Sequence, residues 1–307
     1  MLRELRRPRA RPRKRMKFGV ASMTAPLKEV ALRRPGNSLI KADPKAWNYS
    51  KHFNPSEIEN EYESFVLALE NFGVNIHWIL GDDLGNADAV FAYDASLMTP
   101  RGVILMSLGK EKRWGEEGLH KSFYSSKGIT IIGQVEAPGT AEAGDTLWLD
   151  ETTAVIGKGF RTNDLGAEQI KSILNAIGIK CYIFDLPFYQ GKSACLHLMS
   201  LISMVDTKTA LVYETLLPVG LWKLLNEKNI NIISAPENEF YESDTLSTNV
   251  LALAPGKCLM LDNLPETKKV LRNADIKVTT FQAPALCIGC EGGPTCLTRP
   301  LFRDADA

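Results

Sequence analysis

The stretch DTLWLDETTAVIGKGFRTNDLGAEQIKSILNAIGIKCYIFDL, residues 145–186, contains one complete structural unit. Its opening, 145–159, has two β-rich runs, which predict two neighbouring strands. Residues 162–178 have the amphipathic period of a helix, with a Thr-Asn pair at the start and a glycine at the end. Residues 180–186 predict a further strand. The unit therefore has the order strand, strand, helix, strand.

The same unit recurs along the chain. Amphipathic stretches that predict helices lie at 55–73, 114–127, 162–178, 218–229 and 264–274. Each is followed by a β-rich run, at 74–79, 129–133, 180–186, 230–235 and 276–281. Two strand candidates precede most helices, at 89–107, 145–159, 201–213 and 249–262. A period of about 50 residues predicts an α/β propeller-like array. We find no G-x-G-x-x-G turn of the competing doubly wound sheet.

The copy around helix 55–73 lacks its first strand locally. The C-terminal stretch around Cys296 could supply this strand by pairing beside 27–34, which would close a ring. Such a closure would place Cys296 at the centre, where the loops of the other units converge.

Composition describes an ordinary globular chain. Of its 307 residues, 45% are hydrophobic and 23% are charged, and no run of eighteen apolar residues predicts a membrane span. The net charge of zero conceals a tail, because residues 1–15 hold eight of the 36 basic residues and one of the 36 acidic residues. Residues 16–307 therefore have a formal net charge of 28 − 35 = −7. We expect residues 1–15 to be a disordered basic tail and 16–307 to be one catalytic domain.

The basic tail has two interpretations. Clustered arginine is typical of binding to nucleic acid or to an acidic surface. The interpretation that we favour is a leader upstream of Met16, so that nucleic acid is not an expected partner. No apolar segment of a secretory signal follows the tail, and we expect a cytoplasmic protein with reduced cysteines.

The cysteines allow a metal site as an alternative. Cys287 and Cys290 have the C-x-x-C spacing of zinc or iron–sulfur ligands, and Cys296 follows them. A fourth ligand with convincing spacing is missing, so we expect no metal and no cofactor. A disulfide between Cys287 and Cys290 is conceivable, but nothing in the sequence specifies it.

Cys296 is the strongest candidate for a reactive residue. It lies in EGGPTCLTRP, where two glycines and a proline predict a tight, sterically open turn. An accessible thiolate can act as a nucleophile. Cysteine nucleophiles usually recruit a histidine that is distant in sequence, and His197, in SACLHLMSL, lies at a segment junction. A histidine between apolar neighbours is otherwise a buried structural residue.

Charged residues beside the predicted elements complete the candidate set. Glu142 and Asp145 lie in PGTAEAGD, a loop of small residues that leads into a strand. Asp88 and Asp94 flank VFAY, and each carboxylate is either functional or a strand-end cap. Two arginines precede helices, where a planar guanidinium suits a carboxylate ligand. These are Arg113 and Arg161.

Taken in order, six segments resemble the guanidino-group-modifying superfamily, the penteins. They are DAVFAYDASLMTPRG, RWGEE, EAPGTAEAGD, RTN with GAEQI, LHL and GGPTC. They cover about residues 88–296, with weaker similarity from about residue 27. The resemblance is nearest to the dimethylarginine dimethylaminohydrolases and looser to arginine deiminases. It implies a five-bladed α/β propeller with an active site on its axis.

The resemblance also implies roles. Cys296 would be the nucleophile, His197 the general acid and base, and Glu142 the carboxylate beside His197. Asp88 and Asp94 would receive the guanidinium. The remaining pair, Arg113 and Arg161, would bind the substrate α-carboxylate. The implied reaction is hydrolysis of arginine or N-methylated arginine through a covalent thiouronium, which gives citrulline and ammonia or an alkylamine.

Two departures and several alternatives stay open. Arginine deiminases have an aspartate where this chain has Met199, and we expect a more apolar space there that suits alkylated guanidines. A glutamate of the dimethylargininases is replaced by Tyr93. Spacing does not separate hydrolysis from amidino transfer, or arginine from agmatine. A non-catalytic binding protein on the same fold is a further alternative, and a homodimer is left open.

Overall fold

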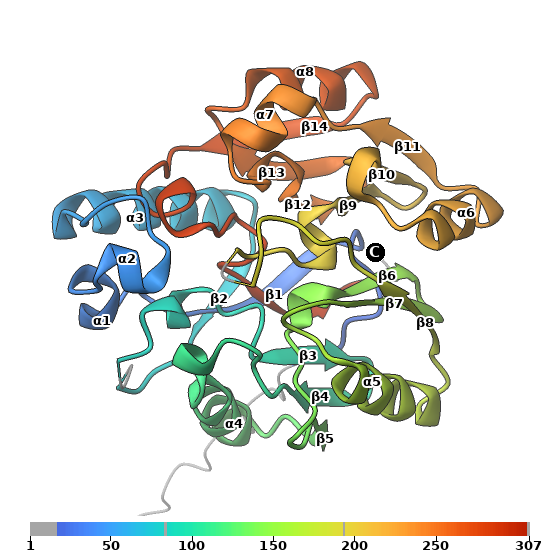
Figure 1. Cartoon of the computed structure of the whole chain (residues 1–307), viewed down its shortest axis with the longest axis horizontal. Helices are drawn as coiled ribbons and strands as arrows, with labels where there is room; N and C mark the ends of the chain where they lie inside the picture. Colours follow the sequence, from blue (N-terminus) through green and yellow to red (C-terminus); the bar gives the residue numbers. More distant parts are fainter. Residues whose placement is uncertain (1–16, 83–84, 193, 306–307) are drawn as a thin grey trace, which may run out of the picture.

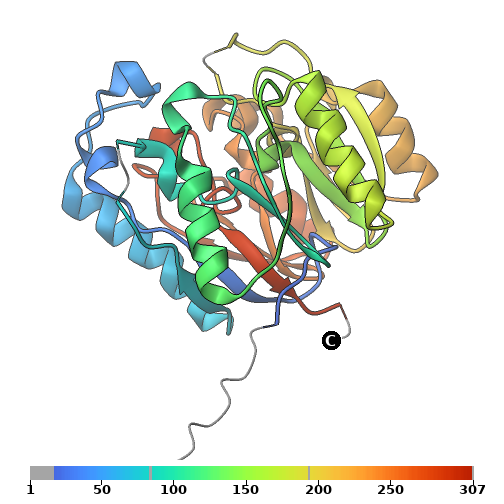
Figure 2. The same ribbon diagram turned by 90° about the horizontal axis from the view of Figure 1, so that it is seen from below.

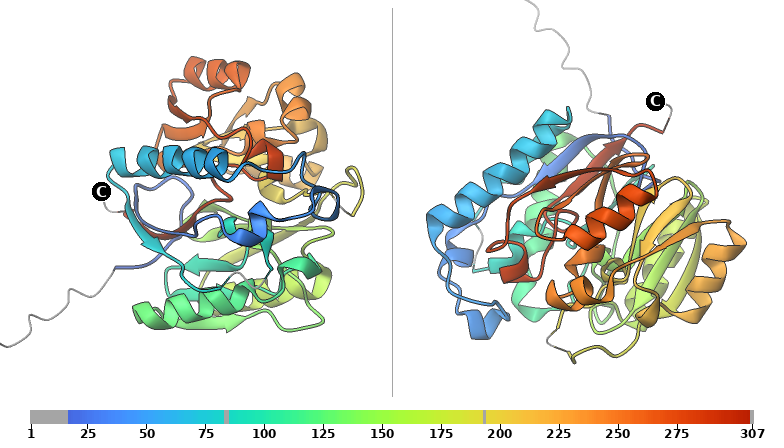
Figure 3. Two further views of the ribbon diagram at one scale, coloured as in Figure 1. Left: turned by 90° about the vertical axis from the view of Figure 1, so that its left-hand side faces the viewer. Right: turned by 90° about the horizontal axis from the view of Figure 1, so that it is seen from above.

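A computed structural model describes residues 17–82, 85–192 and 194–305. Five separate three-stranded sheets surround a common centre, and the longer helices lie outside them (Figure 1). The side views show the same helices on the outer surface (Figure 3). The predicted α/β propeller built from a repeated strand–strand–helix–strand unit is confirmed.

The unit read from residues 145–186 shows how each blade forms. Strands β6 (Thr146–Asp150) and β7 (Thr153–Lys158) pair antiparallel, and β8 (Lys180–Asp185) returns parallel to β7. Helix α5 (Asp164–Ala176) makes the connection, because parallel strands need a long crossover. The Asn163 side chain accepts a hydrogen bond from the Gly166 N–H and caps this helix.

Three other blades have the same order. In each, an antiparallel pair is followed by an outer helix and a parallel strand. Their elements are β3 (Ser96–Thr99), β4 (Gly102–Leu105), α4 (Glu116–Lys127), β5 (Ile131–Gln134); β9 (Ile202–Asp206), β10 (Thr209–Val212), α6 (Val219–Glu227), β11 (Asn231–Ser234); and β12 (Leu251–Ala254), β13 (Lys257–Leu261), α8 (Pro265–Asn273), β14 (Lys277–Phe281). The predicted helices and strands agree with these elements within a few residues.

The remaining blade joins the two ends of the chain. Strand β15 (Arg299–Arg303) pairs antiparallel with β1 (Leu27–Leu32), and α3 (Pro55–Asn71) leads to β2 (Asn75–Trp78), which is parallel to β1. The two terminal strands lie side by side in Figure 2. This confirms the predicted closure by the C-terminal stretch. Cys296 precedes β15 by three positions and is thereby carried to the centre.

Short 3-10 turns between the strands and helices contain Asp88 and Arg113, and two others begin directly after Glu142 and His197. A 3-10 turn tightens the backbone over three or four residues and so redirects it toward the axis. The turns at the centre are η1 (Ala87–Val90), η2 (Glu111–Arg113), η3 (Ala143–Asp145), η4 (Leu198–Ser200), η6 (Leu246–Thr248) and η7 (Ile288–Cys290). Three short helices were not predicted, namely α1 (Asn37–Ile40), α2 (Pro44–Trp47) and α7 (Glu237–Glu242).

None of the helices in the described part of the chain is both long and apolar enough to cross a membrane. The basic tail that was expected at residues 1–15 lies outside the described residues.

Candidate active site

A cavity of about 30 Å³ lies at the centre, where the turns of several blades converge. Six of the seven predicted site residues line it, and the seventh, Glu142, lies directly behind His197. The six are Asp88, Asp94, Arg113, Arg161, His197 and Cys296. All are buried or half-buried, so charges that meet here are poorly screened by solvent.

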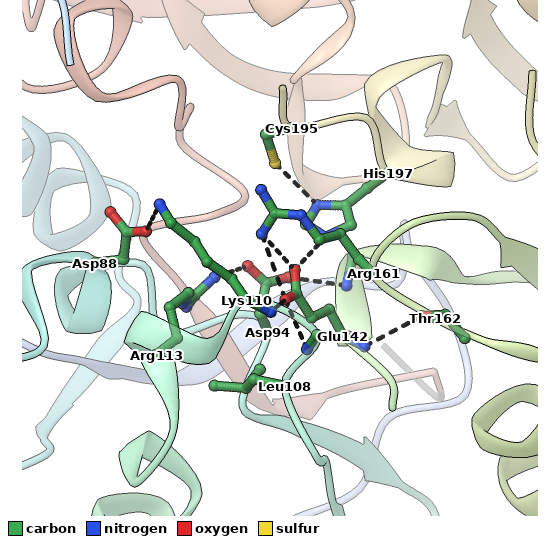
Figure 4. Close-up of polar contacts among 12 residues, drawn as sticks. Asp88, Asp94, Leu108, Lys110, Arg113, Glu142, Arg161, Thr162, Cys195 and His197 are labelled. Carbon is green, nitrogen blue, oxygen red and sulfur yellow. Dashed lines mark hydrogen bonds and ion pairs between the residues drawn. The ribbon is translucent and has the colours of Figure 1, made fainter. Parts of the chain in front are cut away.

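His197 and Glu142 form a buried pair. His197 Nε2 lies 2.7 Å from Glu142 Oε2 (Figure 4). Burial by itself lowers the pKa of His197, but its interactions with Cys195, Asp94 and Asp145 outweigh burial and raise this pKa well above its ordinary value. The imidazole is therefore held in its protonated form. Glu142 binds Nε2, so Nδ1 is the ring nitrogen that does not bind Glu142.

Glu142 is fixed by several donors. Its Oε1 accepts hydrogen bonds from the backbone N–H groups of Gly109 at 3.1 Å and Lys110 at 3.2 Å, and Arg161 Nη1 lies 3.3 Å from Oε2. Burial alone raises the pKa of Glu142, but Arg161 and His197 hold it well below the usual range. The carboxylate stays ionised and orients the imidazole.

Asp94 and Arg113 form a second buried pair. Arg113 Nη1 donates to Asp94 Oδ2 at 2.7 Å, and its Nε and Nη2 donate to Glu116 at 3.0 and 2.8 Å. Nη2 also donates to the Phe91 carbonyl at 3.1 Å. The other Asp94 oxygen accepts from the Gly144 N–H at 3.0 Å. Arg113 is 3% exposed, and most of its donors are already used within the protein.

Asp88 is engaged by two partners that sequence reasoning missed. The Tyr49 hydroxyl donates to Asp88 Oδ1 at 2.5 Å, and Lys110 Nζ donates to Oδ2 at 2.5 Å. Figure 4 shows the Lys110 side chain extended across the site to Asp88. A substrate cation that binds Asp88 would therefore compete with the Lys110 ammonium. No spacing in the sequence indicates these contacts, because Tyr49 lies on the segment after α2.

Cys296 is a half-buried residue of the cavity wall. The Asn249 Nδ2 amide donates to its sulfur at 3.1 Å. Burial, together with the neighbouring Asp94 and Cys195, raises the pKa of the Cys296 thiol to about 12, while His197 acts in the opposite direction. The thiol is neutral at physiological pH in this structure.

The two glycines before Cys296 have a different purpose from the one predicted. Both have ordinary backbone angles. A Cβ on Gly292 would lie 2.2 Å from the Phe91 ring, and one on Gly293 would lie 2.5 Å from the Asn249 side chain. The expectation of a sterically open turn is wrong, because the glycines allow close packing that holds Cys296 beside Phe91 and Asn249.

A second thiol, Cys195, was also missed. Its sulfur lies 3.6 Å from His197 Nδ1, and it lines the same cavity. The signal available in the sequence was its position two residues before His197. In an extended segment such residues point to the same side.

Among the described residues, one group of side chains could hold a metal ion. The atoms of Asp94, Glu142 and His197 lie within 4.8 Å of one another. These carboxylates are already paired with cationic side chains, Asp94 with Arg113 and Glu142 with Arg161, so a metal ion would have to compete with these ion pairs. The alternative set around Cys287 and Cys290 does not form such a group within the described ranges.

The two departures lie outside the cavity wall. Met199 is buried in η4, and it is not among the described residues that line the cavity. The apolar space expected from Met199 is therefore not part of this wall. The Arg299 guanidinium lies over the Tyr93 ring, 4.0 Å from its centroid, and Tyr93 does not line the cavity.

Comparisons with known proteins agree with this geometry. A family model described as arginine deiminase matches residues 75–221 and 214–303. The N(G),N(G)-dimethylarginine dimethylaminohydrolase of Pseudomonas aeruginosa is 30% identical over 236 residues, which cover 74% of this chain and 84% of that protein.

Solved structures give the same fold. A cysteine-to-serine mutant of dimethylarginine dimethylaminohydrolase from Pseudomonas aeruginosa, complexed with citrulline, has a TM-score of 0.72 at 23% identity and covers 89% of this chain and 98% of that one. The amidinotransferase SxtG from Microseira wollei, of a saxitoxin biosynthetic pathway, has a TM-score of 0.75 at 16% identity and covers 94% and 98%.

Proposed function

The chain belongs to the arginine deiminase family, and from this premise we propose that it hydrolyses the guanidino group of arginine or an N-methylated arginine through a covalent intermediate on Cys296. The observation that carries the proposal is that the Cys296 thiol and the His197 imidazole line one buried cavity, with the Glu142 carboxylate bonded to that imidazole from behind. The products are a ureido compound and ammonia or an alkylamine.

Binding comes first. A guanidinium is planar and cationic, so its central carbon is a poor electrophile until it is held in place. Asp94, beside Cys296 and His197, offers a carboxylate for this purpose. Asp88 is the second predicted carboxylate, and it becomes available once Lys110 is displaced from it. Two hydrogen bonds to one plane fix the direction of attack.

The attack needs a thiolate. The bound cation lies next to Cys296 and lowers the pKa of its thiol, which releases its proton to solvent. The sulfur then forms a bond to the guanidinium carbon. His197 Nδ1 donates its proton to the terminal nitrogen, and the bond from that nitrogen to the carbon breaks. Ammonia or an alkylamine leaves, and a thiouronium remains on Cys296.

Hydrolysis completes the cycle. His197, now neutral, takes a proton from a water molecule that attacks the thiouronium carbon. The carbon–sulfur bond breaks and returns the thiolate, and the second proton of the water is lost to solvent, which leaves the neutral ureido product. Glu142 keeps the imidazole oriented and stabilises its protonated form in both steps.

Replacement of the nucleophile tests the proposal. Cys296→Ser should abolish release of citrulline from arginine and from mono- and dimethylarginine, and no covalent adduct should appear by mass spectrometry. Cys181→Ser is the matched control, because Cys181 lies in β8 and does not line the cavity. Formation of citrulline by Cys296→Ser at the wild-type rate would overturn the assignment.

A further inference from the structure

The segment that carries Cys296 also borders a second cavity. This cavity has a volume of about 10 Å³, which is space for a single water-sized species. It shares no lining residue with the catalytic cavity, but chain neighbours line the two. Tyr93 and Thr295 line the second cavity, whereas Asp94 and Cys296 line the catalytic one. The second cavity is therefore a separate place in the fold that adjoins the wall holding the thiol.

Two buried arginines line this second cavity without a carboxylate. Arg299 is 1% exposed and Arg303 is 5% exposed, and they lie at the two ends of β15. No aspartate or glutamate is among the described residues that line the cavity, and neither arginine forms an ion pair within the described ranges. Arginine stays protonated, so two positive charges are held away from water here. Buried charges are ordinarily paired with an opposite charge.

Neutral groups compensate part of the charge of Arg299. Its Nη1 donates to the backbone carbonyls of Tyr93, at 3.0 Å, and of Ser96. Its guanidinium also lies over the Tyr93 ring. A carbonyl and an aromatic ring lower the energy of a buried cation, but they carry no net charge, so the positive charge of Arg299 is not neutralised.

Arg303 is compensated in a similar way. Its Nη1 and Nη2 donate to the carbonyls of Ala25 and Ala252 at 2.7 and 2.8 Å. Burial lowers the pKa of Arg303 to about 10, and the positive charge of Arg299 acts in the same direction. The two cations therefore destabilise each other, and an anion between them would stabilise both.

Two polar atoms of the wall have no hydrogen-bond partner among the described residues. They are Arg299 Nε and Thr295 Oγ1. A buried donor without a protein partner indicates the place of a bound water molecule or ion. A water molecule could accept one of these hydrogen bonds, but it would leave both positive charges uncompensated. A small anion would accept both hydrogen bonds and offset the charges as well.

One side of the cavity leads to the surface. Ser22 and Met23 are half-buried, and with Met204 they line both the cavity and a surface groove of about 400 Å³. The other residues that line the cavity are buried. The fold therefore offers a small ion a route from solvent to the two arginines.

We propose that the second cavity is an anion-binding site, in which Arg299, Arg303 and the Thr295 hydroxyl hold one small inorganic anion such as chloride. A volume of about 10 Å³ is too small for sulfate, phosphate or a carboxylate that carries a side chain. The site does not depend on the proposed function, because it uses none of the groups that line the catalytic cavity.

An anion at this site stabilises the closure of the ring. Both arginines belong to β15, and their donors reach carbonyls in three other segments. These carbonyls belong to Ser96 in β3, Ala252 in β12 and Ala25 before β1. An anion that holds both guanidinium groups therefore links the C-terminal strand to these segments. Because it binds only the folded chain, it raises Tm by mass action.

Thermal unfolding of the full chain tests the site. We would replace sodium gluconate stepwise by sodium chloride at constant ionic strength, because gluconate is too large for the cavity. Tm should rise with the logarithm of the chloride concentration, and bromide should act in the same way. A crystal soaked in sodium bromide should show an anomalous-scattering peak between the guanidinium groups of Arg299 and Arg303.

Thr295→Val removes one donor with little change of shape. It should raise the Kd for chloride, obtained from the Tm series, by about three- to tenfold, as loss of one hydrogen bond does. Arg299→Met should remove the chloride dependence, and if that variant does not fold, Thr295→Val still decides the question. Thr267→Val is the matched control, because the Thr267 hydroxyl is also buried without a partner among the described residues, but Thr267 lies in α8 and does not line the cavity. It should keep the wild-type Kd.

Three results would overturn the site. They are an equal Tm in chloride and in gluconate, the same change of Kd in Thr295→Val and Thr267→Val, and a bromide peak that appears only elsewhere. The first result would mean that a water molecule, and not an anion, satisfies the donors. All of these readouts measure stability or binding of the ion, so failure of the proposed enzymatic function would leave them unchanged.

Discussion

Two walls of the catalytic cavity differ in how their charges are arranged. The polar wall (Asp94, Arg113, Arg161 and His197, with Glu142 behind them) consists of buried groups that are paired with opposite charges. The thiol wall (Gly292 and Cys296, with Asn249 behind them) contributes a close-packed backbone, a neutral sulfur and the amide that donates to it.

The difference has opposite consequences for ionisation. On the polar wall the pKa of Glu142 is held low and that of His197 is raised, so both groups are charged. On the thiol wall burial raises the pKa of Cys296 to about 12. The charged groups of the polar wall are thus in place in the free protein, whereas under the proposed function the Cys296 thiol would be activated by the substrate cation.

Removal of the charge of Glu142 should break the polar wall. Glu142→Gln leaves Arg161 and His197 without their buried carboxylate. We expect kcat to fall by about 10²–10⁴, the range of general acid–base catalysis. The pKa of His197 should fall, so the alkaline limb of the kcat profile should move to lower pH.

Steady-state kinetics across pH would measure this effect, with circular dichroism to establish folding. The same substitution at Glu151, an exposed turn residue, serves as the control. A kcat within threefold of the wild type would show that Glu142 does not position His197.

The state of the thiol wall can be measured directly. A thiol whose pKa is raised is alkylated slowly at neutral pH, because the thiolate is the nucleophile. In the free enzyme we expect the rate of iodoacetamide addition to Cys296 to rise about tenfold per pH unit between pH 7 and pH 9. Peptide mass spectrometry would assign the labelled site. A rate that is constant over this range would indicate a preformed thiolate, and the contrast between the walls would fail.

The smallest expected effect concerns the backbone behind the polar wall. A Cβ on Gly166 would lie 1.9 Å from the Thr140 carbonyl oxygen, in the loop that leads to Glu142. Gly166→Ala should lower the free energy of unfolding by about 1–3 kcal/mol, as overpacking does. Gly118 in α4 has open space around its Cβ position, so Gly118→Ala should be neutral or stabilising by about 0.5–1 kcal/mol.

Urea denaturation of both glycine variants would measure these values. Equal stability of the two would mean that the contact between α5 and the Thr140 loop yields easily and does not fix Glu142.

Local features of the fold were predictable because they depend on short-range periodicity. The Asn163 cap, the unit over 145–186 and the pairing of the C-terminal strand with β1 all follow from patterns of apolar and turn residues. The predicted site residues were found through a resemblance that carries motifs, and the structure brings them together. Their roles stay predictions until the substitutions above are made.

Contacts between distant turns were not predictable. Tyr49 and Lys110 meet Asp88 across 39 and 22 positions, and Asn249 meets Cys296 across 47. No periodic pattern records such a pair, because each partner belongs to a different turn. The glycines before Cys296 were misjudged for the same reason, since Phe91 and Asn249 approach them from other blades.

By itself, the sequence determined the repeated unit and the closure of the ring, because periodicity is a local property, and its resemblance to a family supplied the candidate reactive groups. Only the tertiary structure decided the protonation state of those groups and which residues surround the cavity. It buries Cys296 and surrounds His197 with negative charge. It also places Lys110 and Arg161 on the wall of the cavity. The pKa of a side chain and the residues that surround a cavity depend on groups within a few ångströms, and only folding brings such groups together from distant parts of the sequence.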